Sequence, residues 1–315
     1  MASIGSAAAP SADAVRRRIS GRRLDVPGRL FEGMLLLALL ISLAVLLTLL
    51  ADVASRGMGV FVDRGLGFVT APLSSDPAKA GIGQGMFGSL MLMLIVAAVA
   101  FPIGIGAAIY LEEYARDTLL TRFFTANIRN LAGVPSIVYG LLGLAVFVIA
   151  LRSFTGPDVK GRSILAGGLT LAVVVLPIVI ITASEALRAV PRGIREAAYG
   201  VGATRWQVVR SHVVPYAAPG ILTGTILAMA RAFGETAPLI MVGGAVSFLN
   251  TGDRGLIETL QGKYTTLPTS IYQWVQEPRR DFVALTAAGI LALLATILVV
   301  NGIAIILRNR FARRW

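Results

Sequence analysis

Two charged residues lie within an otherwise apolar stretch, and one of them, an arginine, could bind an anion. Arg231 and Glu235 are four residues apart, so on a continuous helix they would share one face and could form an ion pair. A charged side chain in the middle of a membrane span costs roughly 2.5–3.5 kcal/mol, so we expect this pair to face a water-filled path. There Arg231 would offer its planar guanidinium to an oxyanion, with Glu235 orienting it and Thr236 adding a hydroxyl donor. The alternative is that the pair only locks one helix to another.

A polar, basic segment at residues 185–216 lies between two apolar stretches and predicts two short helices. Pro191 suits the start of the first helix, and the glycines that follow suit its end. Thr204 and Gln207 have the spacing of a capping box, which would begin the second helix. Such a stiff protrusion could pass the movement of a partner to the attached helices, whereas the alternative is an ordinary connecting loop. The candidate docking residues are Pro191, Arg195, Glu196, Ala197, Ala198, Gly200, Gly202 and Pro215.

The apolar stretches themselves predict an all-α, polytopic membrane protein. Hydrophobic residues make up 56% of the 315-residue chain and charged residues 15%, with the charges clustered between apolar runs. A run of about 20 apolar residues matches the hydrocarbon thickness of a bilayer. We therefore expect six transmembrane helices, at residues 33–52, 88–111, 131–151, 163–184, 217–246 and 282–307.

The distribution of positive charge predicts a multi-pass protein of the cell membrane with both ends in the cytoplasm. Most of the 29 Lys and Arg residues fall before the first span, after the second and fourth spans, and in the C-terminal tail. The net charge of +12 then follows from topology and requires no nucleic acid partner. The expected regions are a disordered basic arm at 1–32, a span and extracytoplasmic loop at 33–84, the main transmembrane domain at 85–307, and a basic tail at 308–315.

Three stretches resemble the permease subunits of bacterial ABC importers. Residues 196–215 contain Glu-Ala-Ala, a glycine four residues after the second alanine and a later proline, which resembles the EAA loop that docks onto the ATPase. Residues 130–140, NLAGVPSIVYG, and 231–239, RAFGETAPL, resemble the PstA-type permeases of phosphate importers. His212 and Val214 depart from the family pattern, which has isoleucine and leucine before the proline.

The resemblance implies a six-helix MetI-like permease fold that forms half of a translocation pathway for inorganic phosphate. It also implies that the chain contacts membrane lipid and has three protein partners. These are a PstC-like permease subunit as the other half of a heterodimer, a PstB-like ATPase dimer, and a PstS-like phosphate-binding protein outside. On this resemblance the EAA loop carries the coupling to the ATPase. Arg231 and Glu235 would then face the path.

The sequence argues against an enzyme. With no cysteine and one histidine, it lacks a nucleophile–base set, and it has no G-x-x-x-x-G-K-[ST] loop for ATP. We therefore expect no cofactor in this chain and ATP hydrolysis in a partner subunit. Glu112, Glu113 and Asp117 lie close together and are expected to form a solvated helix face rather than a metal site.

Two alternatives stay open for the function. One is an ABC permease for another oxyanion, such as phosphonate, sulfate or molybdate, because fold-level analogy does not fix a substrate. The other is a secondary transporter driven by an ion gradient, which would have no use for a docking loop and should show an inverted repeat.

Overall fold

The computed structural model describes residues 26–244 and 255–311, which form helices and connecting loops with no strand among them. Five of these helices are long and apolar enough to cross a membrane, or six if one bent pair counts as a single span. The prediction of an all-α polytopic protein is confirmed. The chain divides into two units, Met1–Asp52 and Val53–Trp315, and each is described by itself.

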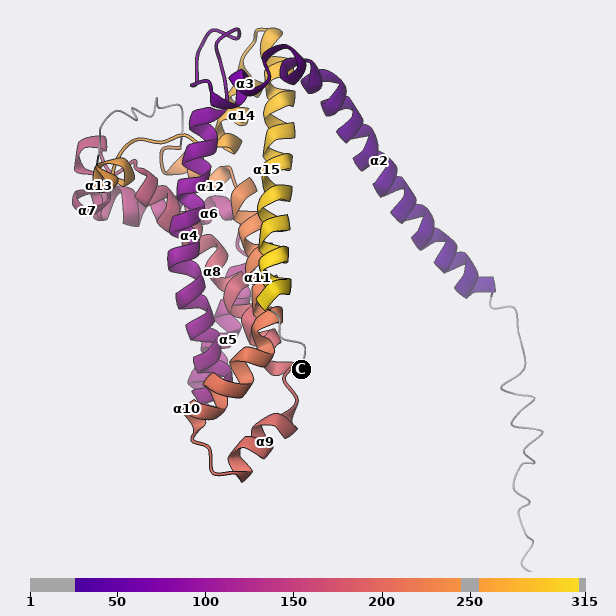
Figure 1. The fold of residues 1–315 in the computed structure, drawn as a ribbon, viewed down its shortest axis with the longest axis vertical. Helices are drawn as coiled ribbons and strands as arrows, with labels where there is room; N and C mark the ends of the chain where they lie inside the picture. The colour runs from indigo at the N-terminus through magenta and orange to yellow at the C-terminus, as the bar shows by residue number, and fades with distance from the viewer. Residues whose placement is uncertain (1–25, 245–254, 312–315) are drawn as a thin grey trace, which may run out of the picture. The chain divides into compact units, whose positions relative to one another are not determined.

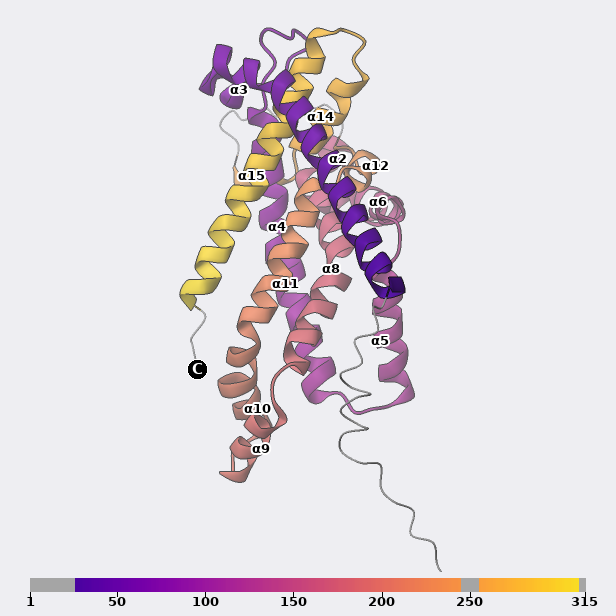
Figure 2. The same ribbon diagram turned by 90° about the vertical axis from the view of Figure 1, so that its right-hand side faces the viewer.

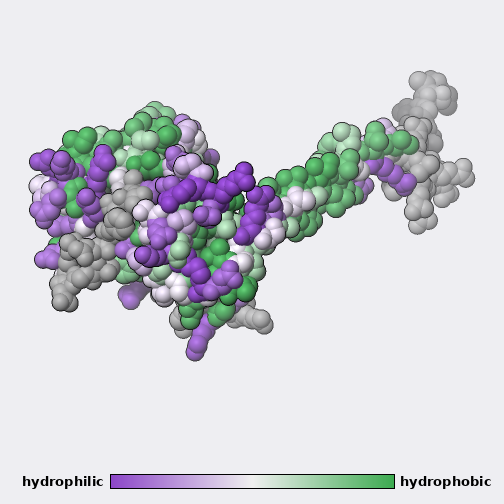
Figure 3. All heavy atoms as spheres, turned by 90° about the horizontal axis from the view of Figure 1, so that it is seen from above, coloured by the Kyte–Doolittle hydropathy of each residue, from purple (hydrophilic) through white to green (hydrophobic). Residues whose placement is uncertain are grey.

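Helix α2 (Val26–Arg64) contains the first predicted span but is longer than residues 33–52 at both ends. Its part within the first unit is exposed on every side, and apolar residues cover most of the surface of α2 that Figure 3 shows. A helix that is apolar all round suits a lipid environment. The predicted disordered arm at 1–32 is therefore wrong for residues 26–32, which are helical, while residues 1–25 lie outside the described part.

The second unit begins with the last turns of α2, where a loop was expected. Residues 53–64 are helical and are followed by the short helix α3 (Leu66–Thr70), so the predicted extracytoplasmic loop starts later than expected. Gly57 lets this part of α2 pack closely against the bundle. A Cβ at this position would lie 2.7 Å from the Ala287 carbonyl carbon, so the glycine allows the backbones of α2 and α15 (Asp281–Phe311) to touch.

The core of the second unit is built by α4 (Gly83–Ile109), α8 (Ile164–Arg188) and α11 (Val214–Gly234), which run alongside one another with α15 (Figures 1 and 2). Their buried apolar side chains form one continuous cluster. A Cβ added at Gly104 of α4 would lie 2.7 Å from the Val179 side chain of α8, so close approach of these two helices requires a glycine there. The second and fourth predicted spans, at 88–111 and 163–184, are confirmed by the apolar helical segments Gly83–Tyr114 and Ile164–Arg188, which coincide with them to within a residue or extend beyond them.

The third predicted span, at 131–151, is wrong as a single helix. The structure places a helix α5 (Leu119–Ala132) before a break at residues 133–135, and then α6 (Ser136–Gly143), which continues as the π-helix η2 (Leu144–Ala150). The two segments are bent by 104°. Proline disfavours the helical conformation of the residue before it, so the Gly-Val-Pro sequence ends α5 and lets the chain turn.

The fifth predicted span, at 217–246, is also interrupted. Helix α11 ends at Gly234, Glu235 is extended with a ψ of 123°, and α12 (Ala237–Met241) follows. Pro238 favours a break here, because in a continuous helix its ring would lie against the carbonyl of residue 234. Residues 245–246 lie outside the described part of the chain.

Shorter helices complete the second unit. Helix α14 (Leu267–Gln276) packs against α15 and α4 at one end of the bundle, with residues 267–271 and Trp274 buried. Helix α15 contains the sixth predicted span and continues through 308–311 of the expected tail. Residues 312–315 lie outside the described part. The remaining elements are α7 (Arg152–Thr155), the 3-10 helix η3 (Pro157–Val159) and α13 (Leu256–Leu260).

Candidate functional site

A two-helix protrusion extends from the end of the bundle opposite α14 (Figures 1 and 2). Helix α9 (Arg192–Gly200) is followed by Gly202, whose φ of 84° is a left-handed conformation that favours glycine. Helix α10 (Arg205–Val208) begins with the predicted capping box. The Thr204 backbone N–H donates to Gln207 Oε1 at 2.8 Å, and the Gln207 N–H donates to Thr204 Oγ1 at 3.4 Å. The predicted pair of helices around a glycine is confirmed.

The candidate docking residues lie on different faces of this protrusion. Ala198 is buried in a cluster that includes Val208 and Val213, so it fixes α9 to the bundle. The π-helix η4 (Val209–Val213) joins α10 to α11 without a break, so the protrusion continues directly into a long helix. Pro215, in the first turn of α11, is half-buried. The exposed candidates are Pro191, Glu196, Ala197, Gly200 and Gly202.

Arg195 points inward and holds the protrusion against two other helices. Its Nη2 donates to Glu113 Oε1 at 2.6 Å and to the Leu187 carbonyl at 2.9 Å, and its Nη1 donates to the Val190 carbonyl at 2.8 Å. The Arg195 side chain is 21% exposed and that of Glu113 only 7%. One guanidinium therefore neutralises a buried carboxylate and satisfies two backbone carbonyls at the end of α8.

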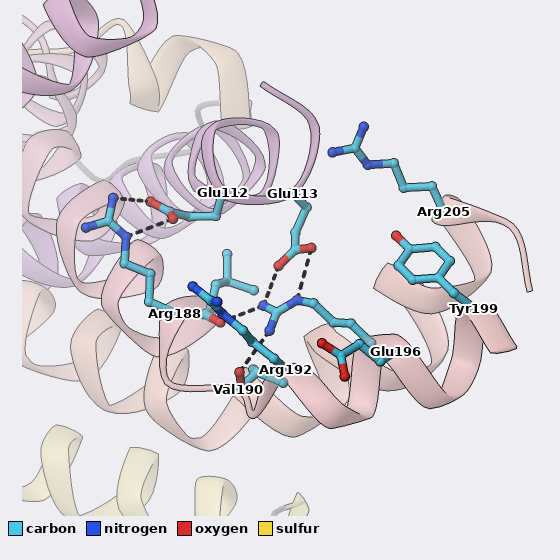
Figure 4. Close-up of a pocket in the computed structure, with 10 residues that line it drawn as sticks. Glu112, Glu113, Arg188, Val190, Arg192, Glu196, Tyr199 and Arg205 are labelled. Atoms are coloured by element: carbon cyan, nitrogen blue, oxygen red, sulfur yellow. Dashed lines mark hydrogen bonds and ion pairs between the residues drawn. The ribbon is translucent and has the colours of Figure 1, made fainter. Parts of the chain in front are cut away.

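Glu113 and its neighbour Glu112 come from the π-helix η1 (Tyr110–Tyr114), which ends α4. Glu112 forms a separate bidentate pair with Arg188 of α8, with both nitrogen–oxygen distances at 2.8 Å. This second pair is more open, since Arg188 is 50% exposed. Figure 4 shows Glu112 pointing toward Arg188 and Glu113 pointing toward a second guanidinium. Both glutamates line a pocket of about 670 Å³, together with residues from the end of α8 and from the protrusion.

The prediction of a solvated helix face at Glu112, Glu113 and Asp117 is wrong for the two glutamates, because each of them pairs with an arginine. Asp117 is exposed and bound by Arg122 at 2.7 Å through both oxygens, and these hydrogen bonds lower the pKa of Asp117. No group of three acidic or histidine side chains within residues 26–244 and 255–311 could hold a metal ion. Sequence reasoning missed the role of Glu113 because its partner is 82 residues away.

The predicted Arg231–Glu235 ion pair is present, but its predicted geometry is wrong. Arg231 Nε lies 3.3 Å from Glu235 Oε1, although Glu235 stands just beyond the end of α11 rather than one turn along it. The pair therefore lies at a helix break instead of the middle of a span. Arg231 is 54% exposed and Glu235 15%, so the guanidinium remains accessible on one side. Thr236 follows in the break, with its hydroxyl 3.5 Å from the Gly234 carbonyl.

The structure brings together the two other sequence stretches that resembled the family. Helix α6 packs against α12, and a Cβ added at Gly140 would lie 2.7 Å from the Pro238 Cα. The Tyr139 hydroxyl donates to the Leu131 carbonyl at 2.8 Å, across the break between α5 and α6. Two interrupted helices thus meet next to the segment that carries Arg231 and Glu235.

Long apolar helices, two broken segments and a polar two-helix protrusion define a multi-span membrane transport component. Residues 100–314 match the family described as binding-protein-dependent transport system inner membrane component, and the chain belongs to this family. Its members are membrane-spanning transport components rather than enzymes.

Several relatives are similar over most of their length. The chain is 33% identical over 219 residues to the probable ABC transporter permease protein YqgI of Bacillus subtilis, covering 70% of this chain and 71% of that one. It is 34% identical over 242 residues to the phosphate transport system permease protein PstA of Yersinia pestis, covering 76% and 75%. It is 31% identical over 234 residues to PstA 1 of Mycobacterium tuberculosis, covering 74% and 71%.

Solved structures show the same fold. A bacterial alginate ABC transporter matches with a TM-score of 0.61 at 14% identity, covering 90% of this chain and 95% of that chain. The inward-facing methionine transporter MetNI matches with a TM-score of 0.55 at 20% identity, covering 73% and 95%. The predicted MetI-like permease fold is confirmed.

Proposed function

We propose that this chain is the permease subunit of an ATP-driven phosphate importer and forms half of its translocation pathway. ATP would be hydrolysed by a separate subunit. The observation that carries the proposal is the protrusion α9–α10. It presents Glu196 outward while Arg195 ties the same helix turn to the membrane-spanning helices.

Coupling to an ATPase requires a rigid element that the partner subunit can bind and displace. The Ala198 contact, the capping box and the continuous connection through η4 into α11 give the protrusion that stiffness. Exposed Ala197 and Gly200 allow a partner surface to approach closely, and Glu196 can pair with a basic residue on it. Movement of this element would displace the attached spans.

Phosphate as the cargo is supported by the names of the relatives and by the chemistry of Arg231. Two of the relatives described above are phosphate transport system permeases. In this chain the accessible Arg231 guanidinium can form bidentate hydrogen bonds to an oxyanion. The Glu235 carboxylate, 3.3 Å away, can pair with the guanidinium again when the anion leaves. Thr236, in the same break, can donate its hydroxyl.

The proposal includes the partners and the orientation. A PstC-like permease would form the other half of the pathway, a PstB-like ATPase dimer would seat the protrusions, and a PstS-like protein would deliver phosphate from outside. The distribution of positive charge supports a cytoplasmic location for both termini and the protrusion. The candidate permease domain covers residues 85–307.

Phosphate uptake tests the function directly. Uptake at low external phosphate would be measured in cells that lack this chain, with and without its restoration. Sulfate, molybdate and phosphonate would be added as competitors, and ATP would be depleted in one arm. We expect restored uptake that requires ATP and is unaffected by the competitors.

Two results would overturn parts of this proposal. Competition by sulfate, molybdate or phosphonate would assign the same permease to another oxyanion. Uptake that survives ATP depletion but collapses with the ion gradient would assign it to the secondary transporters. The measurement requires a host in which other phosphate uptake systems have been removed.

A further inference from the structure

We infer that the Glu113–Arg195 ion pair is the joint through which the docking helix α9 moves α4. The inference rests on the proposed function and deepens it by naming a positioning pair for the coupling step. Neither residue would touch the cargo. Their role would be to make α4 follow the protrusion when the partner ATPase moves it.

The chain topology leaves α4 without a covalent connection to the protrusion. Helix α8 is joined to α9 through residues 189–191, and α11 continues from α10 through η4. Helix α4 lies far away in sequence, yet it packs along α8 in the core. A movement of α9 therefore reaches α8 and α11 through the backbone but can reach the end of α4 only through side-chain contacts.

The Glu113–Arg195 pair is built to carry such a movement. Arg195 contacts Glu113 through two nitrogens, at 2.6 Å and 3.4 Å, and the same guanidinium is fixed by the carbonyls of Leu187 and Val190. Separating the pair would leave a carboxylate that is 7% exposed without a counter-charge. A second contact supports it: the Arg205 guanidinium lies 5.1 Å from the centre of the Tyr114 ring.

The π-helix η1 explains how two adjacent glutamates serve different helices. Its wider turn places Glu112 against Arg188 of α8, while Glu113 reaches Arg195 of α9. Of these two ion pairs, the second connects the end of α4 to the docking helix. On α9, Arg195 and Glu196 are adjacent, so one helical turn both contacts the membrane-spanning helices and presents a charge outward. Glu196 takes part in none of the interactions drawn in Figure 4.

The first experiment compares transport with ATP hydrolysis in the complete transporter, reconstituted in liposomes with its partner permease, ATPase and binding protein. In Glu113→Gln we expect phosphate uptake per ATP hydrolysed to fall by about tenfold, because the charge that fixes Arg195 is lost. Hydrolysis itself should continue, since Glu196 and the exposed face of α9 are unchanged. The exchanged pair Glu113→Arg with Arg195→Glu should recover part of the ratio.

The matched control is Asp117→Asn. Asp117 and Arg122 form a bidentate pair near the same end of the bundle, but among residues 26–244 and 255–311 no hydrogen bond or ion pair joins either of them to the protrusion. This variant should keep the wild-type ratio. Equal loss of the ratio in Asp117→Asn and Glu113→Gln would overturn the inference, as would a wild-type ratio in Glu113→Gln.

A second experiment measures movement of α4 independently of the cargo. The chain has no cysteine, so Gly106→Cys on α4 and Gly302→Cys on α15 provide unique sites for a pair of spin labels. A side chain at either position meets open space. We expect the distance between the labels to change when ATP is added, and this change to disappear in Glu113→Gln while the ATPase still co-purifies.

The two experiments separate failure of the inference from failure of the proposed function. Suppose that the wild-type transporter takes up no phosphate but shows the ATP-dependent distance change, and that Glu113→Gln loses this change. That result would reject phosphate as the cargo and support the role of the ion pair in coupling. An unchanged distance response in Glu113→Gln would reject the joint whatever the cargo. Loss of ATPase co-purification in Glu113→Gln would also reject it, because the pair would then serve assembly rather than coupling.

Discussion

Gly140 and Pro238 touch through their backbones: a Cβ added at Gly140 would lie 2.7 Å from the Pro238 Cα. The two residues are 98 positions apart and belong to α6 and α12, the helices that follow the two breaks in the bundle. Their contact holds both broken segments in place, so the position of Glu235 between α11 and α12 depends on it.

A side chain at Gly140 should separate α6 from α12. We expect Gly140→Ala to lower the free energy of unfolding by about 1–3 kcal/mol, because the nearest atom is backbone and cannot rotate away. Thermal unfolding of the purified chain in detergent would measure this change. Gly106→Ala is the control, since an added Cβ there meets nothing within 4 Å. Equal stability of the two variants would contradict the contact.

The glycine between α9 and α10 should be required for its conformation. We expect Gly202→Ala to destabilise the protrusion by about 1–2 kcal/mol, because its φ of 84° is unfavourable for a residue with a Cβ. Gly200→Ala should instead stabilise α9 by about 0.5–1 kcal/mol, since Gly200 is the last residue of that helix and has open space around it. Hydrogen exchange of the α9 amides would distinguish the two directions, and faster exchange in both would count against this assignment.

The two adjacent ion pairs of η1 should differ in their contribution to stability. Glu113→Gln leaves Arg195 without its charge partner in a largely buried site, so we expect a loss of about 3–5 kcal/mol. Glu112→Gln should cost less than about 1 kcal/mol, because its partner Arg188 is half-exposed and can be solvated. Chemical unfolding of both variants would give the comparison. A larger loss in Glu112→Gln would show that burial does not govern these pairs.

Substitutions of Arg231 and Glu235 should have opposite effects on how tightly the anion binds. Under the proposed function, Arg231→Gln should lower phosphate uptake by about tenfold, the loss of one charge-assisted hydrogen bond, and Arg231→Lys should lower it less. Glu235→Gln should lower both KM and the maximal rate, since an unpaired arginine binds the anion more tightly and releases it more slowly. Uptake kinetics in proteoliposomes would measure these effects, with the exposed Arg116→Gln as control. Normal uptake in Arg231→Gln would remove the pair from the path.

Much of the fold was predictable because membrane spans follow from local composition. A long apolar run must be helical in lipid, where every backbone polar group needs an internal partner. The capping box at Thr204 and the glycine turn at Gly202 were likewise predictable, because they involve residues close together in sequence. The Arg231–Glu235 pair was predicted for the same reason.

The breaks were harder to predict from composition, although their causes are present in the sequence. Gly133 and Pro135 interrupt α5 and α6, and Pro238 separates α12 from α11. A proline within an apolar run can kink a helix or end it, as Pro102 and Pro177 show by lying inside continuous helices. The packing of neighbouring helices decides between these outcomes.

The sequence alone therefore determined the all-α membrane class, the two short helices of the protrusion and the presence of the charged pair, because each follows from interactions among neighbouring residues. Only the tertiary structure decided which distant residues meet. Glu113 and Arg195 are both ordinary charged residues in the sequence, and the packing of α4 against α8 makes them partners. Long-range contacts depend on how several helices pack at once, and no local pattern records that arrangement.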